Sequence, residues 1–285
     1  MSSAVPRPLA AVAPWLRCPV CSQPFAPVAG ALACSRGHSF DVARSGYVTL
    51  FETGVPHPFG DDGTMVEARA NVEQAGHFEP LRAALVRTAG EFAGADTSLV
   101  LDVGAGTGQQ LAGVLGSLPE ARGVALDASR PAARCAAGAH DSIAAVRADV
   151  WRQIPLADRA VDVALNVFAP RNGAELGRVI RPGGTVLSVT PTSKHLHELA
   201  ALHSIRLDPE KVTRLRRVLD RWFEPISVRP VTWTLQLSRE QAAAVLRMGP
   251  AGRHLRSDFD RRLATLGEPI RVTCAVQLRA FRRRA

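Results

Sequence analysis

The sequence predicts an α/β fold, in which helices cover both faces of a mostly parallel sheet and a small cysteine-containing module precedes it. Short apolar runs recur between residues 99 and 189 and alternate with helical patterns, which is typical of a parallel sheet. Three cysteines and a histidine cluster before residue 40. The 285 residues are 46% hydrophobic and 21% charged, so the chain can bury a sizeable core and is not a mostly disordered protein.

The chain divides where its composition changes. An apolar run over residues 9–16 is cut short by Pro14 and Arg17, so we expect residues 1–15 to be a disordered lead-in rather than a signal peptide. Residues 16–50 form the cysteine-containing module, and residues 51–64, rich in Gly, Pro and Asp, form a linker or mobile loop. Residues 65–285 are predicted to be one α/β domain. No run reaches the roughly 18 apolar residues of a spanning helix, which argues against an integral membrane protein.

Hydrophobic periodicity predicts the elements of the larger domain. Apolar residues at helical spacing indicate helices over 65–93, 195–222 and 238–248. Short apolar and β-branched runs predict five strands, at 99–103, 122–126, 143–146, 161–167 and 185–189. Residues 228–237 and 270–281 form a late, hairpin-like pair of strands. The alternation of strands and helices implies that the first five strands are parallel.

The small module carries a specific metal-ligand spacing. Cys18 and Cys21 are separated by two residues, and Cys34 and His38 by three. Three thiolates and an imidazole suit tetrahedral Zn²⁺, and a module this small needs such a centre to be stable. Because all four ligands come from the protein, we predict a structural zinc rather than a catalytic one. The alternative is a chance cluster of cysteines.

A glycine-rich turn follows the first predicted strand of the larger domain. Its residues are Asp102, Gly104, Gly106, Thr107 and Gly108. A dinucleotide-binding turn needs a further glycine where this chain has Gln109. Asp102 instead precedes the turn, where a carboxylate can complement the ammonium and sulfonium groups of S-adenosylmethionine. We therefore predict S-adenosylmethionine as the cofactor.

Two further acids follow the next two strands. Asp127 lies 25 residues after Asp102, where a ribose-binding carboxylate is expected, and Asp149 lies where a side chain can meet the adenine. Carboxyl ends of parallel strands share one edge of the sheet, so the three acids should lie together. The alternative is that each is an ordinary strand-end or capping residue. Five parallel strands with a late hairpin are typical of the Rossmann-like sheet of class I methyltransferases.

With these motifs the chain resembles the bacterial 23S rRNA (guanine-N1)-methyltransferase family, from about residue 17 onward. The resemblance rests on the zinc ligands and on the segments GHSFDVARSGYVTL (37–50), MVEAR (65–69), GHFEPL (76–81), NVFAP (166–170), RPGG (181–184) and TPTSKHL (190–196). It implies a zinc module that helps recognise rRNA, a Rossmann-like methyltransferase domain and often a homodimer. The implied substrate is a guanine in hairpin 35 of 23S rRNA. One actinomycete branch protects ribosomes from tylosin-like macrolides.

The resemblance also implies cofactor contacts from Phe78, Thr107, Gly108 and His195. Phe78 departs from the tyrosine often found at its position, so stacking is kept but a hydroxyl contact is lost. Two of these residues have alternatives, because Phe78 can belong to the core and His195 can cap a helix. The residues themselves do not distinguish these roles.

No catalytic base can be assigned from the sequence. The candidates for proton transfer or for contact with the base edge are Asp61, Asp62 and Asn166, and the first two also fit a solvated turn. Guanine N1 lies on the Watson–Crick edge, so the target base must be unpaired or flipped out. The arginines considered for contacts with RNA phosphates are Arg44, Arg69 and Arg171.

Charge and cysteine content bear on partners and compartment. The net charge of +9 favours a polyanion such as RNA, although an arginine- and alanine-rich composition also fits a GC-rich genome. Five cysteines make a poor disulfide framework and favour the reducing cytoplasm. Two other functions remain open: a methyltransferase acting on a polyketide or quinone, and a non-enzymatic protein that binds zinc and RNA.

Overall fold

A computed structural model describes residues 4–51, 60–94, 96–203 and 217–285. Its strands are β1 (Phe25–Val28), β2 (Ala31–Cys34), β3 (Ser39–Asp41), β4 (Tyr47–Thr49), β5 (Leu99–Val103), β6 (Arg122–Asp127), β7 (Ile143–Arg147), β8 (Val161–Val167), β9 (Ile180–Pro191), β10 (Phe223–Leu237) and β11 (Ile270–Arg283). Its helices are α1 (Arg7–Val12), α2 (Gly63–Gln74), α3 (Glu79–Phe92), α4 (Gln109–Gly116), α5 (Arg130–Ala136), α6 (Gly173–Val179), η1 (His197–Leu202), α8 (Arg239–Arg247), η2 (Pro250–His254) and α9 (Phe259–Ala264).

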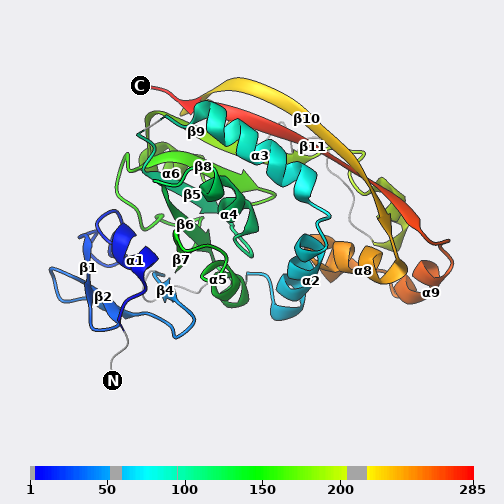
Figure 1. The fold of residues 1–285 in the computed structure, drawn as a ribbon, viewed down its shortest axis with the longest axis horizontal. Coiled ribbons are helices and arrows are strands. Elements are labelled where there is room, and N and C mark those ends of the chain that lie inside the picture. The colour runs from blue at the N-terminus through cyan, green and yellow to red at the C-terminus, as the bar shows by residue number, and fades with distance from the viewer. Residues whose placement is uncertain (1–3, 52–59, 95, 204–216) are drawn as a thin grey trace.

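An eight-stranded sheet forms the centre of the molecule, with the order β10-β11-β9-β8-β5-β6-β7-β4 (Figure 1). The strands from β9 to β4 run parallel, whereas β11 and β10 are antiparallel to their neighbours. This confirms the predicted α/β class and all seven predicted strands of the larger domain, most with slightly different ends. The strand order switches at β5, because β6 and β7 follow on one side of it and β8 and β9 on the other, so the ligand edge predicted for such a sheet lies at the carboxyl end of that strand.

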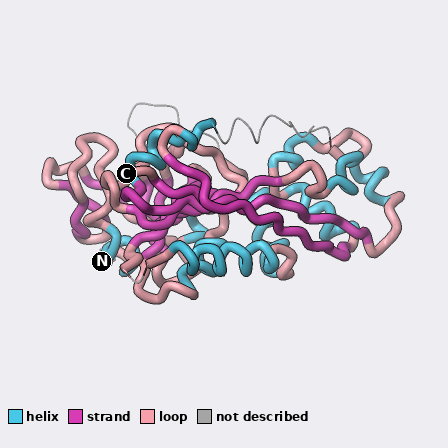
Figure 2. Tube along the Cα trace, turned by 90° about the horizontal axis from the view of Figure 1, so that it is seen from above, coloured by secondary structure: helices cyan, strands magenta, loops and turns pink. Residues whose placement is uncertain are grey.

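Apolar helix faces cover both sides of the sheet. One buried cluster joins α3, α4 and α5 to one face and to the β10–β11 ribbon, and the other joins α1 and α6 to the opposite face. The β10–β11 ribbon extends beyond the rest of the sheet to α8 and α9, as Figure 2 shows. None of the helices in the described ranges is both long and apolar enough to cross a bilayer.

The predicted disordered lead-in at residues 1–15 is wrong for the part that the structure describes, which begins at residue 4. Residues 7–12 form α1, with Leu9 and Val12 fully buried against β6 and β7. Pro6 precedes the helix and Pro8 lies in its first turn, where a missing backbone N–H costs nothing. Pro14, which argued for disorder, lies just beyond the end of this packed helix and does not interrupt it.

The predicted boundary between module and main domain at residue 50 also needs correction. The strands β1, β2 and β3 form a separate small sheet, but β4, placed in the module, extends the main sheet by pairing with β7. A β-bridge between Leu16 and Leu156 adds a second connection. The cysteine-containing module and the main sheet are therefore joined through backbone hydrogen bonds.

The helical predictions were partly correct. Part of the predicted loop at 51–64, residues 52–59, lies outside the described residues, and its last residues begin α2, which Asp62 caps. The single helix expected over 65–93 is two helices, because Gly76 adopts φ +74° between them. Of the helix expected over 195–222, the short η1 is present, and residues 204–216 are outside the described ranges. The helix predicted at 238–248 is confirmed as α8.

Candidate functional site

The four predicted metal ligands converge in the small module. Their ligand atoms lie within 4.8 Å of one another. Cys21 Sγ lies 3.6 Å from Cys34 Sγ, and His38 Nδ1 lies 3.6 Å from Cys18 Sγ and 3.4 Å from Cys34 Sγ. Zn–S bonds of about 2.3 Å put neighbouring sulfurs in a tetrahedral site about 3.8 Å apart. The residues therefore fit a structural Zn²⁺ held through His38 Nδ1, with no position left for a substrate.

The glycine turn lies at the carboxyl end of β5 and is fixed to the neighbouring strand. The N–H groups of Gly104 and Ala105 donate to the carbonyl of Leu126, at 2.8 and 3.1 Å. Gly104 has φ +71°, and a Cβ there would lie 2.6 Å from the Ala169 side chain. Glycine is therefore required both by the backbone conformation and by close approach of the loop after β8. Gly108, with φ +82°, begins α4.

Asp102 is a fully buried carboxyl group behind this turn. Its Oδ1 has no hydrogen-bond partner among the described residues. Burial, together with the nearby acids Asp127 and Glu73, raises its pKa to about 8. A buried, partnerless acid of this kind carries its proton at neutral pH and can ionise when a cation is placed beside it. This fits the ammonium group of S-adenosylmethionine.

Asp127 ends β6, where the sequence placed it. Its Oδ1 accepts the Ser129 N–H at 2.8 Å, and its Oδ2 accepts the Gly106 N–H at 2.9 Å. Burial raises the pKa of this carboxyl group, and the two backbone N–H groups oppose the rise. The carboxylate thus holds the glycine turn against β6, and each oxygen keeps a further lone pair for a ribose hydroxyl.

Glu73, which no sequence motif singles out, completes the acidic group around the turn. The Thr107 hydroxyl donates to Glu73 Oε2, and burial raises the pKa of Glu73. Arg69, on the same helix α2, donates to Asp61 Oδ2 at 2.5 Å and to the Met248 carbonyl at 2.6 Å. Arg69 is therefore engaged within the protein beside the turn rather than offered to RNA. Glu73 has no motif of its own, because only the packing of α2 places it here.

Two other predicted cofactor residues have internal partners. Asp149 follows β7, and its Oδ1 accepts the Trp151 N–H at 2.9 Å. Phe78 is 5% exposed and packs edge-to-face on Trp233, with ring centroids 5.6 Å apart. The structure thus places Asp149 at the predicted edge of the sheet and Phe78 in the core, and a cofactor contact for either stays a prediction.

His195 and Phe168 form a stacked pair beyond the ends of β9 and β8. Their ring centroids lie 5.7 Å apart at 27°. His195 Nδ1 accepts the Ala275 N–H at 3.2 Å, so the ring proton lies on Nε2, and burial lowers the histidine pKa to about 4. Phe168 is 44% exposed and has φ +54°, a backbone conformation that is strained for an aromatic residue. An exposed ring is thus fixed near the glycine turn, since Ala169 contacts Gly104.

The three catalytic candidates differ in the hydrogen bonds that their side chains already make. Asp62 accepts the Met65 N–H at 2.9 Å as the cap of α2, and Asp61 is paired with Arg69. Asn166 is fully buried at the end of β8, where its Nδ2 donates to the Pro170 carbonyl at 2.8 Å. Its Oδ1 has no partner within the described part of the chain. Of the three, only Asn166 has a buried polar atom without a partner among the described residues.

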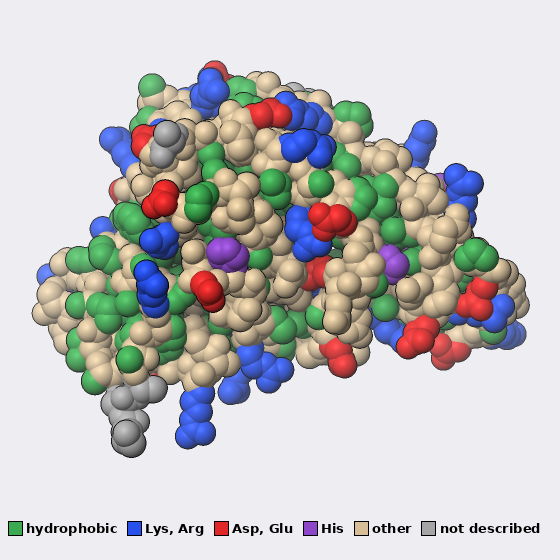
Figure 3. Space-filling model, in the orientation of Figure 1, with side chains coloured by type: hydrophobic (Ala, Val, Ile, Leu, Met, Phe, Trp, Pro, Cys, Tyr) green, Lys and Arg blue, Asp and Glu red, His purple; other side chains and the backbone are tan. Residues whose placement is uncertain are grey.

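The arginines considered for RNA contacts differ in their exposure to solvent. Arg171 is 5% exposed and donates to Ser188 Oγ at 2.7 Å, so it is buried rather than part of the surface. Arg44 is exposed between β3 and β4, as a phosphate contact requires. On the face shown in Figure 3, basic side chains are spread over the surface, with several along the lower edge below the zinc module and α5.

Comparison with known proteins identifies the family. A family model described as the N-terminal zinc ribbon of RlmA matches residues 16–52. A Micromonospora griseorubida protein named as a 23S rRNA (guanine-N1)-methyltransferase is 45% identical, over 94% of this chain and 97% of its own length. The 23S rRNA (guanine(748)-N(1))-methyltransferase of Streptomyces fradiae is 44% identical, over 92% of this chain and 94% of its own. The chain belongs to the 23S rRNA (guanine-N1)-methyltransferase family.

Solved structures agree with this family at the level of the fold. YcgJ of Bacillus subtilis matches 71% of this chain and 99% of its own, with a TM-score of 0.50 and 16% identity. A chain of the complex between the Haloferax volcanii Trm112 activator and a methyltransferase matches 80% of this chain with the same TM-score and 15% identity. Family membership, the sheet order and the acidic glycine turn together make this an S-adenosylmethionine-dependent methyltransferase with a structural zinc module.

Proposed function

We propose that this protein methylates N1 of a guanine in hairpin 35 of 23S rRNA. The observation that carries the proposal is the fixed connection of a zinc ribbon to a methyltransferase sheet, because a small-molecule methyltransferase has no need of that module. Both relatives described above are named for the same reaction on 23S rRNA. The net charge of +9 suits a polyanionic substrate. The reaction would take place in the cytoplasm, where ribosomes are made.

The cofactor would lie along the carboxyl ends of β5, β6 and β7. Asp102 would face its ammonium group, Asp127 its ribose hydroxyls and Asp149 its adenine. When bound, S-adenosylmethionine supplies an electrophilic methyl group on its sulfonium. The partnerless Oδ1 of Asp102 and the close approach of Ala169 to Gly104 are the features that fit this ligand.

The target guanine would be bound at the end of β8. Phe168 offers an exposed aromatic face on which an unpaired base can stack. Asn166 Oδ1 is an acceptor without a partner among the described residues, and the N2–H group of guanine is a donor beside N1. Because Nδ2 is already bonded to Pro170, the amide presents its oxygen rather than its nitrogen. This preference would favour guanine over adenine, which has no 2-amino group.

The N1 proton must leave as the new N–C bond forms. Asp61 is paired with Arg69 and Asp62 caps α2, so neither is free to take that proton. Solvent is therefore the proposed acceptor, and the contribution of the protein is to position the base. Correct positioning can supply much of the rate enhancement of a methyl transfer.

Primer extension tests the proposal directly. Purified protein, S-adenosylmethionine and unmodified 23S rRNA should give a cofactor-dependent stop across hairpin 35, because N1-methylguanine cannot form a Watson–Crick pair. A transcript with adenine at the target position is the matched control. If no stop appears on free rRNA or on ribosomal subunits, the assignment fails and polyketide or quinone acceptors would be tried.

Two further proposals concern the role and assembly of the protein. Expression in a macrolide-sensitive strain should raise the tylosin tolerance if the protein serves resistance, and leave it unchanged if it serves only ribosome maturation. A homodimer, which the family resemblance implies, should appear as twice the 30.4 kDa chain mass in light scattering.

A further inference from the structure

Trp151 is an exposed indole held on a rigid loop. It is 60% exposed, whereas Trp15, Trp222 and Trp233 are half-buried. No ring stacking or cation–π contact involves it within the described residues. Large aromatic side chains exposed on soluble proteins commonly belong to binding surfaces. The mechanism proposed above does not use this residue.

Hydrogen bonds to α6 and to Asp149 fix the loop that carries the indole. The Asn172 side chain donates to the Val150 carbonyl at 3.1 Å, and Glu175 accepts the Ile154 N–H at 2.7 Å. Asp149 accepts the N–H of Trp151 itself. The backbone on both sides of the indole is therefore fixed before any ligand arrives, which lowers the entropic cost of binding.

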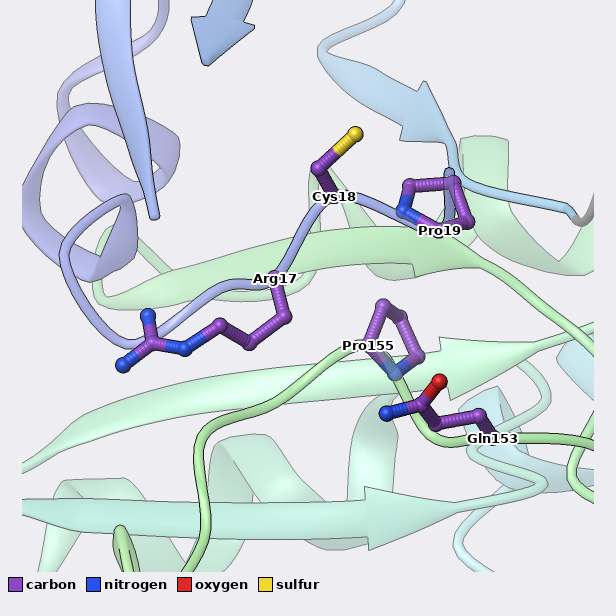
Figure 4. A pocket seen from close by; sticks show the side chains of 5 residues that line it. All are labelled: Arg17, Cys18, Pro19, Gln153 and Pro155. Carbon is purple, nitrogen blue, oxygen red and sulfur yellow. The ribbon is translucent and has the colours of Figure 1, made fainter. Parts of the chain in front are cut away.

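The same loop connects the cofactor edge to the zinc module. It begins at Asp149, beyond β7, and continues to Pro155, whose carbonyl accepts the Arg17 N–H at 3.0 Å. A narrow cavity there is lined by Arg17, Cys18, Pro19, Gln153 and Pro155 (Figure 4). In that view Pro155 and Gln153 face the zinc knuckle that contains Cys18 and Pro19. The loop that carries Trp151 thus contacts the knuckle at its other end.

We infer that Trp151 stacks on an unpaired base of the substrate RNA, beside the target guanine and between it and the zinc module. The inference rests on the proposed function and adds an anchoring residue to it. Base–aromatic stacking is the common means of binding unpaired nucleotides, because every base has a π-face. The exposed Arg152 adds a positive charge next to the indole. The net charge of the chain favours RNA on this surface over an apolar ligand.

Tryptophan fluorescence gives a readout that does not depend on activity. Titration of the wild-type protein with a hairpin 35 transcript should quench the tryptophan emission. It should also protect the most exposed tryptophan from quenching by iodide. Trp151→Phe should bind the transcript within about threefold of wild type and lose most of the fluorescence change. Trp151→Ala should raise the Kd for the transcript about tenfold, and its KM equally, with the kcat and the KM for S-adenosylmethionine unchanged. Val228→Ala, which trims an apolar residue 50% exposed on β10, is the matched control.

Several results would overturn the inference. Full quenching by S-adenosylhomocysteine alone would make Trp151 a cover for the cofactor instead. An unchanged Kd for Trp151→Ala, in a wild-type protein that methylates the transcript, would refute the stacking role and leave the proposed function intact. If the wild-type protein neither binds nor methylates any rRNA, the proposed function fails and the inference fails with it.

Discussion

The buried acid Asp102 should make both folding and cofactor binding depend on pH. Its pKa is raised to about 8 by burial, from 3.8 in an unfolded chain. Between about pH 4 and pH 8 the folded protein therefore binds more protons than the unfolded chain, and stability falls as the pH rises through that window. The unfolded pKa and pH 7 differ by about three pH units. At 1.36 kcal/mol for each unit, keeping Asp102 protonated at pH 7 destabilises the folded state by about 4 kcal/mol.

The substitution Asp102→Asn removes this penalty, because an amide resembles the protonated acid. The extra N–H of the amide would lack an acceptor, and this cost of about 1–3 kcal/mol offsets part of the gain in stability. Denaturant unfolding at pH 7 should therefore show a net gain of about 1–3 kcal/mol, and at pH 4, where the penalty is absent, a net loss of about 1–3 kcal/mol. The variant should also bind S-adenosylmethionine about 10- to 100-fold more weakly, because a buried charge partner is lost.

Calorimetry measures the same coupling from the ligand side. Binding of the cofactor at pH 7 should release roughly one proton from the wild-type protein, and the release should approach zero near pH 9. The difference between wild type and Asp102→Asn isolates this proton from those of the ligand. Asp141→Asn, at an exposed acid, should change nothing. Equal stability of wild type and Asp102→Asn at pH 7, with equal proton release, would refute the reasoning.

Three other predictions concern the turn, the zinc site and the histidine. Gly104→Ala should reduce S-adenosylmethionine affinity and lower the free energy of unfolding by at least about 2 kcal/mol, because φ is +71° and the Cβ would clash with the loop after β8. Gly116→Ala, which meets open space, should do neither. Cys34→Ala should lose the zinc measured by metal analysis, whereas Cys135→Ala, outside the ligand cluster, should keep one ion per chain. His195 should stay neutral down to about pH 5 in an NMR titration, since burial lowers its pKa to about 4. The free energy of unfolding should then fall as the pH drops from 6.5 towards 4. A titration midpoint near 6.5 would contradict the burial of this histidine.

The sequence predicted those features whose signal is local. A zinc knuckle and a strand followed by a glycine turn each lie within a few residues, so spacing alone indicates their chemistry. The same is true of β5 and β8, whose predicted bounds are confirmed residue for residue. Asp102 and Asp127 could be placed at one edge because parallel strands end on the same side.

The features that were missed depend on distant packing. Glu73 resembles a surface acid of a helix until α2 lies over the glycine turn and Thr107 donates to it. The strand β4 is three residues long, and only its pairing with β7 defines it. The apolar run of α1 resembled a broken leader because its burial against β6 and β7 is not visible in its own residues.

The most consequential correction concerns the connection between the zinc ribbon and the catalytic sheet. A flexible linker would let the module bind RNA without determining which base reaches the cofactor. Here β4 lies in the main sheet, and the loop after Asp149 bonds to the module through Arg17. Tyr47 in β4 is also buried, and its hydroxyl accepts from Arg130 at 3.1 Å. The distance from the zinc ribbon to the glycine turn is therefore fixed by the fold, and a fixed distance can select one guanine of a hairpin by its position as well as by its edge.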